Sequence, residues 1–219
     1  MNKIIPVFLI AIIGLAACSK KDKTPPISER IIIYDNLVFS ALKFYDQNQY
    51  FSTFDTSFKR PKGKSDLTET QLKNVDILYF YDWEDSKHGF MDPKTAGKEW
   101  YWNNKYYYYP WLSGSKQTVF YTTELKGEDF IKVKSDPGLF DTYFKDTVIA
   151  KHPVFPDGSC IGGRSTLDMK DLARGQVWAL KSSASGKRSF LYIRADQEHG
   201  WPDYPIKGFS VKVDIITEK

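Results

Sequence analysis

Three β-prone runs near the C-terminus constrain the fold of this chain more than any other feature of the sequence. Residues 176–182 and 188–194 are rich in β-branched and aromatic side chains, and the five residues between them form a turn-rich link of hairpin length. We therefore expect these two runs to pair as antiparallel strands. Residues 208–216 alternate apolar and polar side chains, which predicts a third strand with one buried face. Its apolar positions are Phe209, Val211, Val213 and Ile215, and its polar positions are Ser210, Lys212 and Asp214.

Further strands are predicted upstream, at residues 50–54, 75–83 and 117–123. The run 75–83 is almost continuously hydrophobic, which is typical of a central strand covered on both faces. Residues 84–97 and 150–174 are rich in Gly, Pro and charged side chains, so we expect them to be loops.

Two short helices are predicted among these strands. Residues 66–74 begin with Asp66 as an N-cap and have Glu69 three positions later, the spacing of a capping box. Residues 136–144 have Pro137 at the first helical position, where the missing N–H costs nothing.

These elements predict a mainly β domain, all-β or α+β, built as an antiparallel β-sandwich with two short helices. The strand layout of residues 51–53, 75–81 and 177–193 resembles that of uncharacterised Gram-negative surface lipoproteins and, more distantly, of haem-binding haemophore lipoproteins. The resemblance covers most of residues 45–216, and its strand patterns imply a fold more than a function. Haemophore-like lipoproteins hold haem with a histidine pair, so the resemblance also implies haem binding as an alternative.

The N-terminus carries the pattern of a bacterial lipoprotein signal. A short positive start precedes an apolar core over residues 4–14, and Leu15-Ala16-Ala17-Cys18 follows directly. This tetrapeptide resembles a lipobox, which implies cleavage before Cys18 and attachment of acyl chains such as palmitate to that residue. We expect a signal peptide at 1–17, a lipidated tether at 18–29 and a single β-rich globular domain at 30–219. More than one acyl chain would hold the protein stably on a membrane without a spanning helix.

Composition narrows the classes of partner and compartment. The 219-residue chain is 42% hydrophobic, too apolar for a disordered protein, and its formal charge falls only from +4 to +3 once Lys3 leaves with the signal peptide. Nucleic acid is therefore not expected as a partner. Ser19 directly follows the anchor, and a serine there is compatible with sorting to the outer membrane. The protein could then face either the cell surface or the periplasm. With Cys18 acylated, Cys160 is the single remaining thiol, and we expect it to be structural.

Aromatic side chains make up 16% of the chain, and eight of them lie within residues 100–111. In one continuous strand, Trp100, Trp102, Tyr106 and Tyr108 would share a face. With a two-residue turn at Asn103-Asn104, Trp102 would pair with Lys105 and Trp100 with Tyr107. In both arrangements each face carries rings, and such rings can fill a core or stack on the apolar face of a sugar. The candidate ligand-binding residues are Trp100, Trp102, Tyr106, Tyr107, Tyr108 and Trp111.

Acidic clusters and histidines suggest two alternatives to a non-catalytic binding site, a hydrolase and a haem or metal site. Two groups of carboxylates follow predicted strands, and a pair of acids is what glycoside hydrolysis requires. Their members are Asp82, Glu84 and Asp85 in the first group and Asp196 and Glu198 in the second. The three histidines, His88, His152 and His199, fall in segments expected to be loops, and two of them converging could hold haem or a metal. No recognised catalytic or metal-ligating spacing supports either, so we predict no catalytic residue, no metal and no cofactor.

The sequence as a whole predicts a membrane-anchored envelope lipoprotein with a non-catalytic binding role. Its partners are expected to be the membrane, through the N-terminal lipid, and either a glycan or an outer-membrane protein. The alternatives are a haem- or metal-binding lipoprotein and a hydrolase acting on glycans.

Overall fold

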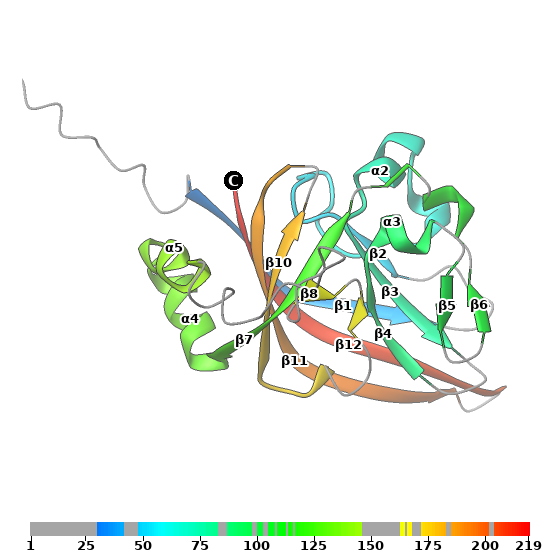
Figure 1. The fold of residues 1–219 in the computed structure, drawn as a ribbon. Helices are drawn as coiled ribbons and strands as arrows, with labels where there is room; N and C mark the ends of the chain where they lie inside the picture. The colour runs from blue at the N-terminus through cyan, green and yellow to red at the C-terminus, as the bar shows by residue number, and fades with distance from the viewer. Residues whose placement is uncertain are drawn as a thin grey trace, which may run out of the picture.

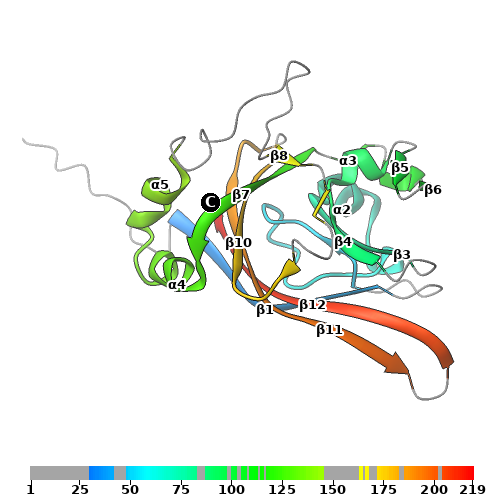
Figure 2. The same cartoon turned by 60° about the horizontal axis from the view of Figure 1, so that its bottom comes forward.

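The computed structural model describes residues 30–41, 48–82, 87–97, 100–102, 105–107, 109–112, 114–115, 117–145, 163–164, 166–167, 172–182, 185–201 and 204–219. Its larger sheet has six antiparallel strands in the order β1-β12-β11-β10-β7-β8. Their bounds are β1 Ile31–Ala41, β12 Tyr204–Glu218, β11 Arg188–Trp201, β10 Gln176–Ser182, β7 Thr118–Lys126 and β8 Gly163–Arg164. The β11–β12 hairpin runs on past its neighbours (Figure 2), since β10 pairs with β11 only up to Tyr192.

A four-stranded sheet faces the larger one, and a two-stranded hairpin stands apart from both (Figure 1). The four-stranded sheet has the order β2-β3-β4-β9, with β2 at Tyr50–Phe51, β3 at Ile77–Asp82, β4 at Lys87–Met91 and β9 at Thr166–Leu167. The separate hairpin consists of β5, Trp100–Trp102, and β6, Lys105–Tyr107. Helices of the described residues are η1 Lys64–Asp66, α2 Glu69–Asn74, α3 Pro93–Ala96, η2 Pro110–Leu112, α4 Gly127–Ser135 and α5 Gly138–Phe144.

The main core lies between the two larger sheets. Phe39 of β1 is fully buried and meets the ring of Phe90 of β4 edge to face, with 5.0 Å between ring centroids. Phe51 of β2 contacts Phe39 and also Tyr34, again edge to face. Leu191 of β11 belongs to the same buried cluster, so both sheets contribute one apolar face. We call this the inner cluster.

The opposite face of the larger sheet is covered by α4 and α5 (Figure 1). Phe140 and Phe144 of α5 pack on Phe190 of β11, with ring centroids 5.0 and 5.3 Å away. Phe130 and Val133 place the apolar stripe of α4 in the same cluster. This second cluster, the outer cluster, is smaller and consists of one sheet face and two short helices.

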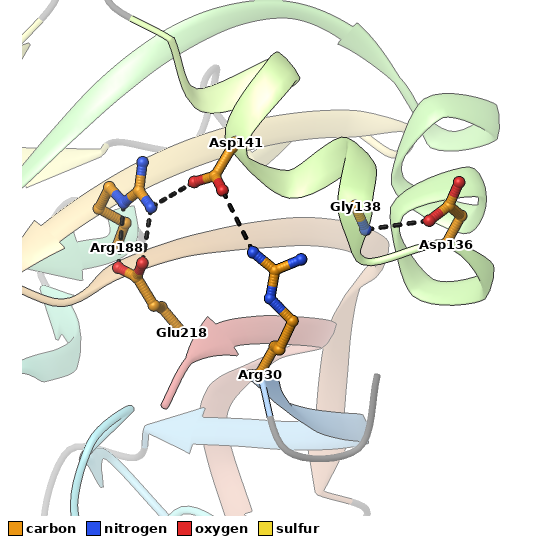
Figure 3. A network of polar contacts seen from close by, with 6 residues as sticks. All are labelled: Arg30, Asp136, Gly138, Asp141, Arg188 and Glu218. Atoms are coloured by element: carbon orange, nitrogen blue, oxygen red, sulfur yellow. Dashed lines mark hydrogen bonds and ion pairs between the residues drawn. The ribbon is translucent and has the colours of Figure 1, made fainter. Parts of the chain in front are cut away.

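An ion-pair network fastens α5 to the start of β11 and the end of β12 (Figure 3). Arg188 at the start of β11 donates to Asp141 of α5 at 2.6 Å and to both carboxylate oxygens of Glu218 at 2.6 and 3.0 Å. Arg30 also approaches Asp141, with 3.6 Å between nitrogen and oxygen. The guanidinium of Arg188 also lies over the rings of Phe140 and Phe144. This one side chain therefore binds both the carboxylate and the rings of α5 at the ends of the two strands.

The expected mainly β, sandwich-like fold is confirmed. The predicted pairing of 176–182 with 188–194 is present, with Trp178 opposite Leu191. Residues 75–80 are all buried, as expected for a central strand. The strands expected at 50–54 and 117–123 correspond to β2 and β7. No helix of the described residues is long and apolar enough to cross a membrane.

Both predicted helices exist, but their first residues differ from the prediction. Thr68, not Asp66, caps α2: its hydroxyl accepts from the N–H of Gln71, whose side chain accepts from the N–H of Thr68. Asp66 lies in η1 instead. Pro137 precedes α5 rather than occupying its first position.

Other assignments were wrong. Residues 84–97 are not one loop, because they contain β4 and α3; Asp92 caps α3 through the N–H of Thr95. Strand β1 and helix α4 were not foreseen. The face of β12 expected to be polar and exposed is largely buried, since Asp214 is 1% exposed and Ser210 is 6% exposed. Asp214 is bound there by the N–H of Asn36 and by Arg194, and Ile216 further along β12 belongs to the outer cluster.

Candidate functional site

The aromatic segment forms a hairpin, as one of the two sequence alternatives required. β5 pairs antiparallel with β6, and the register places Trp100 opposite Tyr107 and Trp102 opposite Lys105. The continuous-strand alternative was therefore wrong. For Trp100, Trp102, Tyr106 and Tyr107 the structure describes the backbone alone, and Tyr108 lies outside the described residues.

Trp111 differs from the other candidates because its side chain is integrated into the domain. It packs against the inner cluster, and its indole N–H donates to the hydroxyl of Tyr50 at 3.2 Å. Tyr109 meets the ring edge to face, and the ammonium of Lys64 lies 4.0 Å from the ring centroid. These contacts anchor the end of the aromatic segment to the core, so Trp111 supports the hairpin rather than extending its free surface.

The carboxylate and histidine candidates do not occupy the loops expected for them. Asp196, Glu198 and His199 lie within β11, where their backbones pair with β12. His88 lies within β4 opposite Tyr81, and Asp82 ends β3 opposite Lys87. β11 continues past the predicted run 188–194, and β4 lies in a segment predicted to be a loop, whereas Asp82 falls at the end of a predicted strand.

The remaining sequence candidates lie outside the described residues. They are Cys18, Glu84, Asp85, His152 and Cys160. Within the described part of the chain, no group of three or more His, Cys, Asp and Glu side chains comes together as a metal site would require.

A buried carboxylate that sequence reasoning did not select lies in the inner cluster. Asp76 is 1% exposed and accepts the N–H of Thr53 at 2.9 Å, while the hydroxyl of Thr53 donates to its other oxygen. Burial raises the pKa of Asp76 to about 7, although the hydrogen bonds from Thr53 act in the opposite direction. Burial and the nearby carboxylates of Asp76 and Asp55 raise the pKa of Tyr34 to about 12. The signal that could have revealed Asp76 is a lone acid inside an apolar run.

Asp92 repeats this role at the same end of the four-stranded sheet, because the end of β4 pairs with the start of β3. It is 1% exposed, caps α3 through Thr95, and accepts the N–H of Thr118 at 2.6 Å. Burial raises its pKa as well. Asp76 and Asp92 both bind backbone N–H groups in the interior, so they hold loops to strands and do not face a substrate.

One cavity of about 600 Å³ opens on the outer face of the larger sheet, where β7 ends and α4 begins. It combines residues that are far apart in the sequence, including Lys126, Arg174 and Tyr192. No sequence motif marked it. In both views α4 and the β5–β6 hairpin lie at opposite ends of the molecule, so the cavity and the aromatic hairpin are separate features (Figures 1 and 2).

Comparison of the chain with known protein families, with curated proteins and with solved structures finds no match.

Proposed function

We propose that this protein is an envelope lipoprotein, anchored in the outer membrane through Cys18, whose β-rich domain binds a glycan or a protein ligand without catalysing a reaction. The lipobox pattern at Leu15-Ala16-Ala17-Cys18 supports the anchor. The proline pair at 25–26 follows the proposed anchor in the sequence, and consecutive prolines are typical of a stiff tether.

The observation that carries the binding role is the separation of the aromatic hairpin from both larger sheets. β5 and β6 form a two-stranded sheet of their own, and five of its six residues are aromatic. An isolated two-stranded hairpin has little intrinsic stability in water. Its attachment through Tyr109, whose N–H donates to the carbonyl of Ala96 at 2.9 Å, and through Trp111 holds it at one end of the domain.

Aromatic rings presented on such a hairpin suit a pyranose. Ring contacts of this kind contribute roughly 0.5–1.5 kcal/mol each, so a few of them give a weak but useful site. The register also pairs Lys105 with Trp102, and lysine is a hydrogen-bond donor that sugar hydroxyls can accept. Trp100 and Trp102 are the residues on which we base the proposed contact, with Tyr106, Tyr107 and Tyr108 as neighbours.

The test combines ligand retention with stability. The double variant Trp100→Ala, Trp102→Ala is expected to keep the melting temperature of the wild type and to lose retention on a glycan array. If the variant unfolds instead, the rings belong to the core and the glycan proposal fails. Retention of an outer-membrane protein rather than a glycan, lost in the same variant, would select the protein ligand.

The anchor is tested separately. The variant Cys18→Ser is expected to leave the membrane fraction and to incorporate no labelled palmitate. Membrane association and labelling that persist in this variant would exclude Cys18 as the acylated residue.

A further inference from the structure

The cavity on the outer face has the composition of a small-molecule site. Its volume of about 600 Å³ lies in the range of ligand pockets in proteins. It is bounded by the end of β7, the first turn of α4, the start of β10 and one residue of β11. The lining residues used below are Lys126, Ile131, Arg174, Gln176, Val177 and Tyr192.

The rim of the cavity is positively charged. Lys126 and Arg174 are exposed, and neither side chain has an ion pair or a hydrogen bond within the described part of the chain. Glu128 is the single carboxylate among the lining residues. The cavity also touches the first turn of α4, which carries Glu128 and Asp129, and Asp129 accepts the N–H of Lys126 at 3.0 Å. These carboxylates offset the helix dipole, so the side chains of Lys126 and Arg174 are what makes the rim suit an anion.

The opposite wall is apolar. Ile131 is 57% exposed, the most exposed large hydrophobic side chain of the described residues, and it lines this cavity. Val177, which also lines the cavity, is buried, and the ring of Tyr192 packs on the ring of Phe130 at a centroid distance of 5.2 Å. A Cβ on Gly127 would lie only 2.8 Å from the hydroxyl of Tyr192, so glycine is what lets this ring lie against the start of α4.

A polar side chain without a partner completes the lining. The Oε1 atom of Gln176 is buried and has no hydrogen-bond partner among the described residues. Leaving such an acceptor unpaired costs about 1–3 kcal/mol, and no bond to Oε1 holds the amide in its present orientation. Turning it towards a ligand would break no hydrogen bond of that oxygen, so Gln176 can respond to an occupant of the cavity.

We propose that this cavity binds a small carboxylate that has one apolar face. The carboxylate lies at the rim with Arg174 and Lys126, where a guanidinium can donate two parallel hydrogen bonds, and the apolar face lies against Ile131 and Tyr192. Acidic sugars and alicyclic acids share this chemistry. The site is distinct from the aromatic hairpin and does not depend on the proposed function.

The test titrates the full-length protein with two matched pairs of probes, followed by calorimetry and by the amide NMR signals of Gly127 and Gly175. The pairs are cyclohexanecarboxylate with cyclohexanecarboxamide, and D-glucuronate with D-glucuronamide. At least one acid is expected to bind about tenfold or more tightly than its neutral amide, with an affinity that falls as salt is raised. Tighter binding of glucuronate would identify a sugar ligand, and tighter binding of cyclohexanecarboxylate an alicyclic one.

Variants assign the binding to the cavity. Arg174→Gln is expected to weaken binding of the preferred acid about tenfold, and Ile131→Ser about threefold. Lys181→Gln is the matched control, because it removes a charge from an exposed residue of β10 that does not line the cavity. Both cavity residues are exposed, and circular dichroism verifies that each variant is folded.

The proposal is overturned if neither acid binds, if acids and amides bind equally, or if Arg174→Gln binds as the wild type does. The double variant at Trp100 and Trp102 should bind the acid normally. If Arg174→Gln loses binding of the acid and the double variant keeps it, the cavity and the aromatic hairpin are independent sites. Either proposal can then fail without the other.

Discussion

The two faces of the six-stranded sheet are built from the same strands but are covered in different ways. Along β10, Trp178 and Leu180 belong to the inner cluster, whereas Val177 and Ala179 belong to the outer one. The inner face is covered by a second sheet, and the outer face by two short helices (Figure 1). The inner face is thus a continuous core, whereas the cavity opens on the outer face at the first turn of α4.

Buried charge differs between the faces as well. On the inner side, Asp76 is enclosed and its neighbours are hydrogen-bond donors without charge. On the outer side, Glu218 is a third exposed and is bound by Arg188, whose hydrogen bonds hold the pKa of Glu218 below its usual value. The inner side therefore stabilises a neutral carboxyl group, whereas the outer side uses an ionised one to attach a helix.

The largest effect should come from the inner core. Phe39→Ala removes a fully buried ring that contacts Phe51, Tyr79 and Phe90, and should lower the free energy of unfolding by about 3–5 kcal/mol. Phe144→Ala in the outer cluster should cost less, about 2–3 kcal/mol, because a short helix can shift to fill part of the space. Denaturant titration of both variants tests this difference. Equal losses would show that the helical layer is as tightly packed as the sandwich.

The next largest effect is a pH dependence of the free energy of unfolding, caused by Asp76. Its pKa is raised from 3.8 to about 7 by burial, so the folded state binds a proton more tightly than the unfolded state does. Stability is therefore greatest below about pH 4 for this group and decreases as the pH rises through 7, by at most about 4 kcal/mol. Asp76→Asn mimics the protonated acid and can keep both contacts with Thr53.

Measurement of unfolding free energy at a series of pH values separates Asp76 from other groups. The variant Asp76→Asn should match the wild type near pH 4 and exceed it above pH 7. A wild-type profile that rises between pH 4 and 7, with the variant parallel to it, would contradict this assignment. Because Asp76 belongs to the inner face, the effect should persist in Phe144→Ala.

The smallest effect concerns the attachment of the helical layer. Arg188→Gln removes the contacts with Asp141 and Glu218 and the cation–π contacts with α5, and should cost about 1–2 kcal/mol. The loss should shrink at high salt, since the partners are partly exposed. Lys132→Gln, which removes the ion pair between the exposed Lys132 and Asp129, serves as the control and should leave the melting temperature unchanged. A salt-independent loss in Arg188→Gln would mean that the ring contacts dominate.

The elements predicted correctly are those whose partners are close in the sequence. The β10–β11 hairpin and the β5–β6 register both follow from a short link and from the order of residues on either side of it. Strand β1 escaped detection because its alternation is interrupted: Asn36 has a φ of 56° at a bulge between Tyr34 and Leu37. The N–H of Asn36 donates to Asp214 at 2.7 Å, a partner 178 residues away that no local pattern reveals.

Helix α4 and the carboxylates of β11 show a second limit of prediction from local sequence. The segment 127–135 directly follows β7 and contains the β-branched Ile131 and Val133, so its local propensity gives no clear helix signal. Asp196 and Glu198 were placed on a loop because the hydrophobic pattern of β11 ends before them, yet backbone pairing continues to Trp201. Pairing with β12 extends the strand beyond the residues that its own side chains would support.

By itself the sequence determined that this chain forms antiparallel β structure and where the β10–β11 hairpin turns, because strand period and turn chemistry are local properties. Only the tertiary structure decided which polar groups are buried and where a cavity exists. Thr53 donates to the buried Asp76, and Arg174, Lys126 and Tyr192 line one cavity, although these residues are far apart in the sequence. Burial and desolvation depend on what covers a residue, and a local pattern of side chains does not contain that information.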